Sequence, residues 1–304
     1  MMEPNLSLSY ADQEERRRVF WSIYILDKLC SCGRAKPAAI ADAHCRVQLP
    51  CDEITFRDGA WKKMPTLDQI LSAGDSTTFH PGHLALVVLV ACIVGRCAQH
   101  SIHESSKDES WLPPWDSKSD FATIYSVLLQ LETQFEMGES ISEALHRNCL
   151  QEERLDMRIA GPLVFSHALF HASQCILHHP FLLSLQLKRK GIKAPPSFLT
   201  RALQTCREHA CSLSELLRQS TRAGCTVYYS FMGYCATLAG GIHTMFVMNA
   251  DVSIRQQARD CLLSDTAFLE EFSSIWGNGK EMVSKNLLIQ IGTDVENSLR
   301  YCRI

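Results

Sequence analysis

The sequence lacks the close cysteine pairs that mark most structural zinc sites. Its 14 cysteines are spread over 304 residues, and no two of them stand in C-x-x-C spacing. Several lie inside apolar runs such as "VLVACIVGRC" and "GYCATLAGG". This distribution predicts reduced cysteines that serve as small core residues. It predicts no metal ligand and no cofactor in this chain.

An excess of positive charge is also missing. The chain has 30 Lys and Arg against 33 Asp and Glu, which gives a formal net charge of -3. Proteins that bind nucleic acid neutralise phosphates with a basic surface. We therefore expect no direct DNA contact from this chain. The N-terminal stretch "MMEPNLSLSYADQEE" has no basic head followed by an apolar run, so no secretory signal is predicted.

Catalytic motifs are scarce as well. The sequence has no G-x-S-x-G, S-x-x-K or H-E-x-x-H pattern. "GNGKE" at 277–281 lacks the remaining glycine spacing and the Ser or Thr of a phosphate-binding loop. The pattern therefore does not favour an enzyme, although an all-α metal- or small-molecule-dependent metabolic enzyme stays open as an alternative.

What the sequence does have is helical periodicity, which predicts an all-α fold, an irregular multi-helix bundle. A capping box made by Asp12 and Glu15 predicts the start of the first helix. Its body, Val19 to Leu26, is apolar nearly all round, so we expect it to be buried. The polar, proline-containing stretch at about 99–118 predicts a flexible loop.

Two apolar runs bear on membrane insertion. The run 84–95 holds twelve residues, too few to span a bilayer. The run 226–248 is long enough, but it contains several Tyr, Ser, Thr and His residues and has no close basic flank. We therefore predict buried helices and no membrane contact, with a membrane anchor at 226–248 as an alternative.

Two short basic stretches could contact a partner. Arg16, Arg17 and Arg18 point about 100° apart around the helix axis and follow two glutamates, which predicts a solvated or ion-paired helix start. The "KRK" at 188–190 is interpreted as a solvated junction between a helix and a loop. Partner binding or an import signal is the alternative at both places.

A polar stripe follows one face of a later helix. Helical spacing aligns His167, His171, Gln174 and His178 within roughly 40° of one another. Two histidines four residues apart can bind zinc, but no carboxylate lies on this face to act as a general base. The stripe therefore predicts packing with satisfied hydrogen bonds, or the lining of a small-ligand pocket, ahead of a metal site.

One long segment resembles a known family. "EERRRVFWSIYILDKLCSCGRAKPAAIADAHCRVQLPCDE" is similar to the signature of the fungal-specific transcription factor domain, and "FHASQCILHHPFL" at 170–182 resembles a second recurring segment of that family. The matching positions in the first segment are Glu15, Arg17, Arg18, Phe20, Trp21, Tyr24, Asp27, Gly33, Arg34, Ile40, Asp42, Leu49 and Pro50. The signature segment takes in residues 12–52, and the resemblance extends from about residue 12 to residue 290.

The resemblance implies a helical regulatory domain of a nuclear fungal zinc-cluster regulator. It implies protein partners from the transcription machinery or self-association, with a small-molecule effector as a further candidate. We expect residues 1–304 to be one partial regulatory domain, truncated at its N-terminus. The zinc-cluster DNA-binding domain is expected to be absent, and zinc to belong to that cluster alone.

Overall fold

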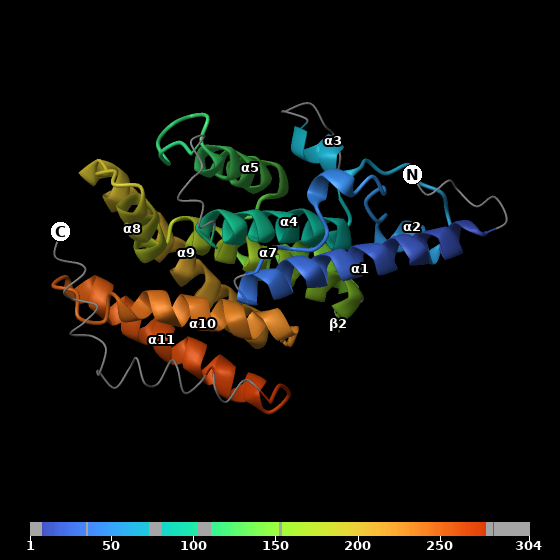
Figure 1. Cartoon of the computed structure of the whole chain (residues 1–304). Helices are drawn as coiled ribbons and strands as arrows, with labels where there is room; N and C mark the ends of the chain where they lie inside the picture. The colour runs from blue at the N-terminus through green and yellow to red at the C-terminus, as the bar shows by residue number, and fades with distance from the viewer. Residues whose placement is uncertain are drawn as a thin grey trace. The chain divides into compact units, whose positions relative to one another are not determined.

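The computed structural model describes residues 8–34, 36–72, 81–102, 111–151, 154–277 and 282, and these ranges are dominated by α-helices (Figure 1). The prediction of an all-α fold is confirmed. The chain divides into two units. The first unit holds residues 1–139 and 144–173, and the second holds residues 140–143 and 174–304.

The first unit is organised by two long helices, α1 (Tyr10–Arg34) and α4 (His83–Ile102), which pack along each other (Figure 1). Shorter elements connect and cover them: η1 (Asp42–His44), α2 (Glu53–Arg57), α3 (Leu67–Ser72) and α5 (Asp120–Phe135). Helix α6 (Ile141–Cys149) leads into two short antiparallel strands, β1 (Leu150–Gln151) and β2 (Arg154–Leu155).

The core of the first unit forms where the aromatic segment of α1 meets α4. Trp21 and Tyr24 are completely buried and pack with Leu49, Leu89 and Cys92. Trp21 lies edge-on to Tyr24, with ring centroids 5.2 Å apart. Burial of large aromatic side chains contributes about 2–3 kcal/mol each to stability. The aromatic residues of the signature therefore form the centre of this unit.

Helix α1 begins one turn earlier than predicted. The backbone N–H of Ser9 donates to Asp12 Oδ2 at 3.2 Å, and the backbone N–H of Asp12 donates to Ser9 Oγ at 3.2 Å. These reciprocal bonds form a capping box with Ser9 as the cap. The prediction that Asp12 is the cap was wrong, because Asp12 occupies the reciprocating position three residues on.

Burial of α1 is one-sided, which also corrects the sequence prediction. Val19 is 60% exposed, Ile23 55% and Leu26 60%. Residues at these spacings share one face of a helix. They lie away from the side that carries Trp21 and Tyr24, which packs on α4. The apolar run from Val19 to Leu26 is therefore buried on one face of the helix and exposed on another.

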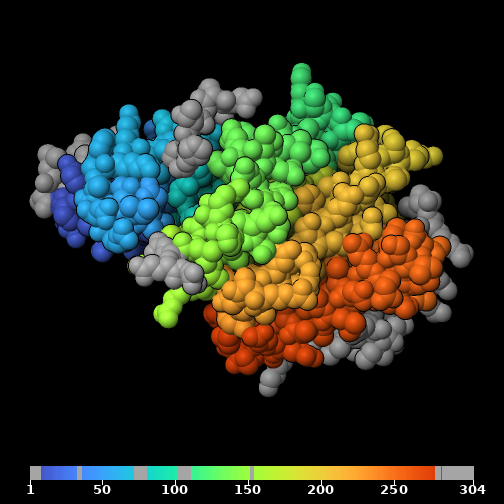
Figure 2. Space-filling view, turned by 180° about the vertical axis from the view of Figure 1, so that it is seen from behind, coloured from blue at the N-terminus to red at the C-terminus, as the bar shows by residue number. Residues whose placement is uncertain are grey.

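The second unit is built from the end of α7 (Met157–Leu177), with α8 (Pro180–Arg189), α9 (Pro196–Arg222), α10 (Ser230–Thr244) and α11 (Val252–Ser273). Helices α9, α10 and α11 pack against one another. Figure 1 shows α10 and α11 running side by side, and Figure 2 shows α11 in orange-red at the surface of this unit.

Gly233 allows the close approach of α10 to α11. A Cβ atom at this position would lie 2.6 Å from Cε1 of Phe272 and 3.0 Å from Sδ of Met282. Phe272 is completely buried, so its ring has little room to move. Glycine is therefore the residue that this contact between the two helices requires.

The two apolar runs behave as core helices. Helix α4 is long and apolar enough to cross a membrane over His83–Ser101, with a mean hydropathy of 1.7, but 67% of that window is buried inside the protein. The prediction counted twelve residues here, whereas the helix continues to Ile102. The run 226–248 is interrupted, because its helix α10 begins only at Ser230 and ends at Thr244.

Because α4 continues to Ile102, the predicted loop at about 99–118 begins later than expected. Residues 103–110 of that loop lie outside the described residues, and 111–119 form turns before α5. Most cysteines in the described ranges are buried free thiols, in agreement with their prediction as core residues.

Candidate functional site

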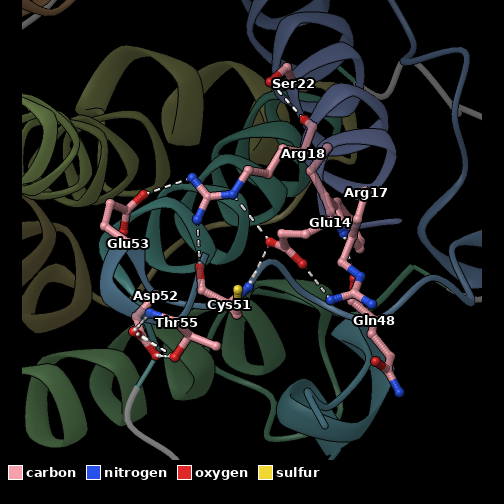
Figure 3. Close-up of polar contacts among 10 residues, drawn as sticks. Glu14, Arg17, Arg18, Ser22, Gln48, Cys51, Asp52, Glu53 and Thr55 are labelled. Carbon is pink, nitrogen blue, oxygen red and sulfur yellow. Dashed lines mark hydrogen bonds and ion pairs between the residues drawn. The ribbon is translucent and has the colours of Figure 1, made fainter. Parts of the chain in front are cut away.

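Two arginines of the signature segment, Arg17 and Arg18, form ion pairs with carboxylates (Figure 3). Arg18 Nε donates to Glu14 Oε1 at 3.2 Å, its Nη1 to Glu53 Oε1 at 2.9 Å and its Nη2 to the carbonyl of Cys51 at 2.9 Å. Arg17 Nη1 donates to Glu14 Oε2 at 2.5 Å. Glu14 also accepts from the backbone N–H of Cys51 at 2.9 Å. This network ties the start of α1 to the segment that leads into α2.

The charge of Arg18 is compensated inside this network. Burial works to lower the pKa of Arg18, but hydrogen bonds and charge attraction from Glu53 and Glu14 outweigh it and raise that pKa. The guanidinium also lies 4.3 Å from the ring centroid of Phe56. Arg17 and Arg18 thus match the prediction of an ion-paired helix start, and of the three arginines only Arg16 is exposed.

A second polar cluster surrounds Asp42. Its Oδ1 accepts from Tyr24 Oη at 2.7 Å and is paired with Lys28 Nζ at 2.8 Å, and its Oδ2 accepts from Arg96 Nε at 2.9 Å. Burial alone would raise the pKa of Asp42, but the hydrogen bonds from Lys28, Tyr24 and Arg96 lower it to about 2. Asp42 is therefore a stable carboxylate that joins α1, η1 and α4.

The other signature residues also serve the fold. Trp21 Nε1 donates to the carbonyl of Gln48 at 2.7 Å, and Asp27 accepts from the backbone N–H groups of Ala39 and Ile40 at 3.0 and 2.9 Å. Phe20 packs partly buried against the core, Pro50 is buried, and Gly33 and Arg34 lie in the last turn of α1. The signature segment thus folds residues 39–53 back onto α1.

The predicted polar stripe is shut away from solvent. His167, His171, Gln174 and His178 are all buried. Burial lowers the pKa of His167 to about 4, helped by nearby His83, and His178 Nδ1 lies 3.0 Å from the carbonyl of Gln174. Among the described residues, the donor atoms of this stripe do not gather into a group able to hold a metal. Its role in lining a pocket stays a prediction.

A different group does gather, and the sequence prediction missed it. Cys211 on α9, His243 on α10 and Cys261 on α11 bring their donor atoms within 4.8 Å of one another. Its two thiols are half-buried and its imidazole is completely buried. We call these residues the Cys211–His243–Cys261 cluster. Spacing could not reveal it, because each residue comes from a different helix.

Two buried residues support His243. Ser214 Oγ lies 2.9 Å from His243 Nε2 and 2.9 Å from Asp265 Oδ2. Burial raises the pKa of Asp265 well above its usual value, against the opposing hydrogen bond from Ser214, and burial lowers the pKa of His243 to about 4. His243 is therefore neutral near pH 7. In a catalytic triad the histidine stands between serine and carboxylate, whereas here the buried serine stands in the middle.

An open cavity of about 920 Å³ adjoins the thiols. Both Cys211 and Cys261 line it, together with polar residues of α9 and α11 that include Glu215, Gln256 and Asp260. The thiols of the cluster are therefore reachable from solvent, whereas Asp265 and His243 lie completely buried behind them. A solute entering this cavity would meet sulfur ligands and carboxylates.

The comparisons with known proteins point to transcription factors. Residues 3–132 match the fungal specific transcription factor domain. The chain is 24% identical over 287 residues to the Zn(2)-C6 fungal-type transcription factor FTF1c of Fusarium oxysporum f. sp. lycopersici, a match that covers 89% of this chain and 29% of that protein.

Further relatives agree. The chain is 24% identical over 288 residues to FTF2 of the same fungus, across 90% of this chain and 25% of that protein. It is 24% identical over 172 residues to the uncharacterized transcriptional regulatory protein C1327.01c of Schizosaccharomyces pombe, across 54% of this chain and 17% of that protein. No solved structure matches.

The matched segment contains α1 to most of α5, and with them the Arg18 and Asp42 networks. The comparisons give no support to the alternative of a metabolic enzyme. The chain spans under a third of the length of the relatives named here. Residues 3–132 of this chain are therefore similar to the fungal specific transcription factor domain.

Proposed function

We propose that this chain is the regulatory part of a fungal zinc-cluster type transcription factor. It acts in the nucleus, controls transcription by RNA polymerase II through contacts with other proteins, and performs no chemistry of its own. The family match over residues 3–132 and the similarity to transcription factors over most of the chain support this proposal. Its partners are proteins of the transcription machinery or a second copy of the chain.

The proposal that this chain does not bind DNA is supported by the ion pairs of the signature arginines Arg17 and Arg18. Arg17 and Arg18 point their guanidinium groups at Glu14 and Glu53. An arginine that binds a phosphate releases counterions and adds to affinity only when its charge is free. With a net charge of -3, the chain has no surplus of cations to replace these two.

A small-molecule effector would find room in the second unit. The cavity beside Cys211 and Cys261 falls in the size range of ligand pockets, which is roughly 300–1,000 Å³. Its lining combines apolar surface with the side chains of Glu215, Gln256 and Asp260, which suits an effector that has both apolar and polar groups. This feature supports a regulatory role in which the helical domain responds to a solute as well as to proteins.

Tethering tests the proposal directly. The chain is fused to an unrelated DNA-binding module, and the expression of a reporter gene downstream of that module's site is measured in a fungal host. We expect the fusion to change reporter output several-fold relative to the module alone. A Trp21→Ala fusion serves as the control, because loss of the buried indole should disrupt the first unit and abolish the effect.

A gel-shift titration of the isolated chain forms the second arm. We expect no sequence-selective, salt-sensitive shift of DNA at any protein concentration that leaves the chain soluble. An intact, well-expressed fusion that leaves the reporter unchanged would contradict the regulatory role. Selective DNA binding by the isolated chain would contradict the claim that it does not read DNA.

A further inference from the structure

The function proposed above uses the cavity beside Cys211 and Cys261 but assigns no role to their thiols or to His243, although the donor atoms of these three residues converge. Among the residues that the structure describes, these three form a group whose donor atoms lie close enough together to hold a metal ion. We propose that it binds one zinc ion through Cys211 Sγ, Cys261 Sγ and a ring nitrogen of His243, with the fourth position open to the adjoining cavity. This inference rests on the geometry of α9, α10 and α11 and not on the zinc in the relatives' names.

The distances suit a tetrahedral site. Zinc–sulfur bonds of about 2.3 Å and zinc–nitrogen bonds of about 2.0 Å place tetrahedral ligand atoms about 3.5–3.8 Å apart. The three donor atoms already lie within 4.8 Å of one another. The upper limit of 4.8 Å exceeds the tetrahedral spacing by about 1 Å, which is the largest shift that zinc binding has to close between any two ligand atoms.

The charges of the site balance when zinc is bound. Cys211 and Cys261 are both free thiols, and their sulfur atoms lie within 4.8 Å of each other. Binding of Zn²⁺ replaces the two thiol protons, and both protons leave to solvent. Two thiolates and one Zn²⁺ sum to zero, so the half-buried site carries no net charge. Histidine binds zinc as a neutral imidazole, so it adds no charge to the site.

The surroundings of His243 fit those of a metal-ligating histidine. Such a histidine uses one ring nitrogen for the metal and gives the other N–H to an orienting acceptor. His243 Nε2 is 2.9 Å from Ser214 Oγ, and that hydroxyl is 2.9 Å from Asp265 Oδ2. Among the described residues, buried His243 Nδ1 has no hydrogen-bond partner and is free to bind a metal.

Asp265 gives independent support. Its carboxyl group is completely buried, and its Oδ1 has no hydrogen-bond partner in the described part of the chain. Burial of a carboxyl group with an unsatisfied oxygen costs free energy, so its presence in a core calls for an explanation. Holding Ser214, and through it the imidazole ring of His243, is such an explanation. Ser214 and Asp265 are thus positioning residues for the zinc ligand.

Cobalt substitution provides the test. The full chain is purified under reducing conditions, its zinc content is measured by elemental analysis, and the metal-free protein is titrated with Co²⁺. We expect one metal per chain, a thiolate-to-cobalt charge-transfer band in the near ultraviolet, and loss of that band when zinc is added. Cys211→Ser and His243→Asn should lose the band, whereas Cys30→Ser, which removes an exposed thiol on α1, should keep it.

The positioning role has its own readout. Ser214→Ala should keep the charge-transfer band but weaken the apparent cobalt affinity about tenfold, as removal of an orienting partner does at other metal sites. Circular dichroism confirms that each variant is folded before it is titrated. An unchanged affinity in Ser214→Ala would show that the hydroxyl does not orient the ligand.

A thiol-protection measurement needs no variant at all. Zinc should protect Cys211 and Cys261 from alkylation in the intact chain, while Cys30 reacts at the same rate with and without zinc. The proposal is overturned if the folded wild-type chain gives no cobalt band, if folded Cys211→Ser binds cobalt as tightly as the wild type, or if the native chain contains a Cys211–Cys261 disulfide.

Discussion

Glu14 is the residue on which the contacts at the start of α1 converge. Its side chain is 6% exposed and accepts hydrogen bonds from Arg17, Arg18 and the backbone of Cys51. Two guanidinium groups therefore depend on one carboxylate for part of their charge compensation. Removing one partner of a buried ion pair costs more than the pair contributes, because the remaining charge stays buried.

Replacement of Glu14 by Gln tests this dependence. Glu14→Gln keeps the shape of the side chain but removes the charge that Arg17 and Arg18 share. We expect the free energy of unfolding to fall by about 2–4 kcal/mol. Urea denaturation measures the change, and Glu15→Gln is the matched control because Glu15 is exposed on the same turn. Equal midpoints for the two variants would rule out the network as a stabilising element.

The sequence reveals such networks only in part. Glu14 and Arg17 stand three residues apart in the sequence, so their ion pair could be predicted from helical spacing. The bonds of Arg18 to Glu53 and Cys51 could not, since those residues come from a segment that folds back onto α1. The Cys211–His243–Cys261 cluster escaped for the same reason, because spacing reports neighbours along the chain and not across helices.

At the scale of elements, the sequence predicted the presence of the helices better than their ends or their buried faces. A proline is expected to end a helix that precedes it, and α7 does end at Leu177, three residues before Pro180. Pro180 itself, however, is the first residue of α8, where its fixed backbone angle favours a helix start. Pro180 therefore marks both the end of one helix and the start of the next, and a rule that treats proline only as a stop would miss α8. The exposed apolar face of α1 was missed because hydrophobicity alone does not show which side has a partner.

The contact between α10 and α11 gives a second prediction. Gly233→Ala places a methyl group against the buried ring of Phe272, so it should lower the free energy of unfolding by about 1–3 kcal/mol. This loss should appear although alanine favours a helix over glycine by about 1 kcal/mol.

Gly241 on the same helix is the matched control. A Cβ atom there meets nothing within 4 Å in the described part of the chain. Gly241→Ala should therefore raise the free energy of unfolding by about 0.5–1 kcal/mol. Thermal denaturation compares the two variants. Stabilisation by both substitutions would show that α10 and α11 do not approach closely at Gly233.

At the scale of the whole molecule, buried histidines should make the fold sensitive to acid. Burial lowers the pKa of His167 in the first unit to about 4, and it does the same for His178, His179 and His209 in the second unit. Nearby His83 adds to the effect at His167, and His209 adds to it at His178. Each histidine is therefore neutral in the folded protein at pH values where its unfolded form takes up a proton.

The sign of the effect follows from this difference. Above about pH 6.5 neither state binds these protons, so their contribution is complete. Between pH 6.5 and 4 the unfolded state binds more protons than the folded state. As the pH is lowered through this range, the free energy of unfolding falls by up to about 1.4 kcal/mol per pH unit for each histidine. Urea midpoints measured from pH 8 to pH 5 should show this decline.

A variant links the slope to particular residues. His167→Gln should make the decline shallower, whereas His146→Gln should leave it unchanged, because His146 is exposed on α6. Urea midpoints that stay constant from pH 8 to pH 5 would contradict the assignment of neutral buried histidines.

The burial of Trp21 has an optical consequence. Of the five tryptophans in the chain, Trp21 is 0% exposed, whereas Trp61 is 63% exposed, Trp115 40% and Trp276 38%. An aqueous quencher such as iodide reaches the exposed indoles and spares an enclosed one. The emission that survives quenching therefore carries a strong contribution from the centre of the signature segment, and it offers a label-free view of that centre while partners or solutes are added.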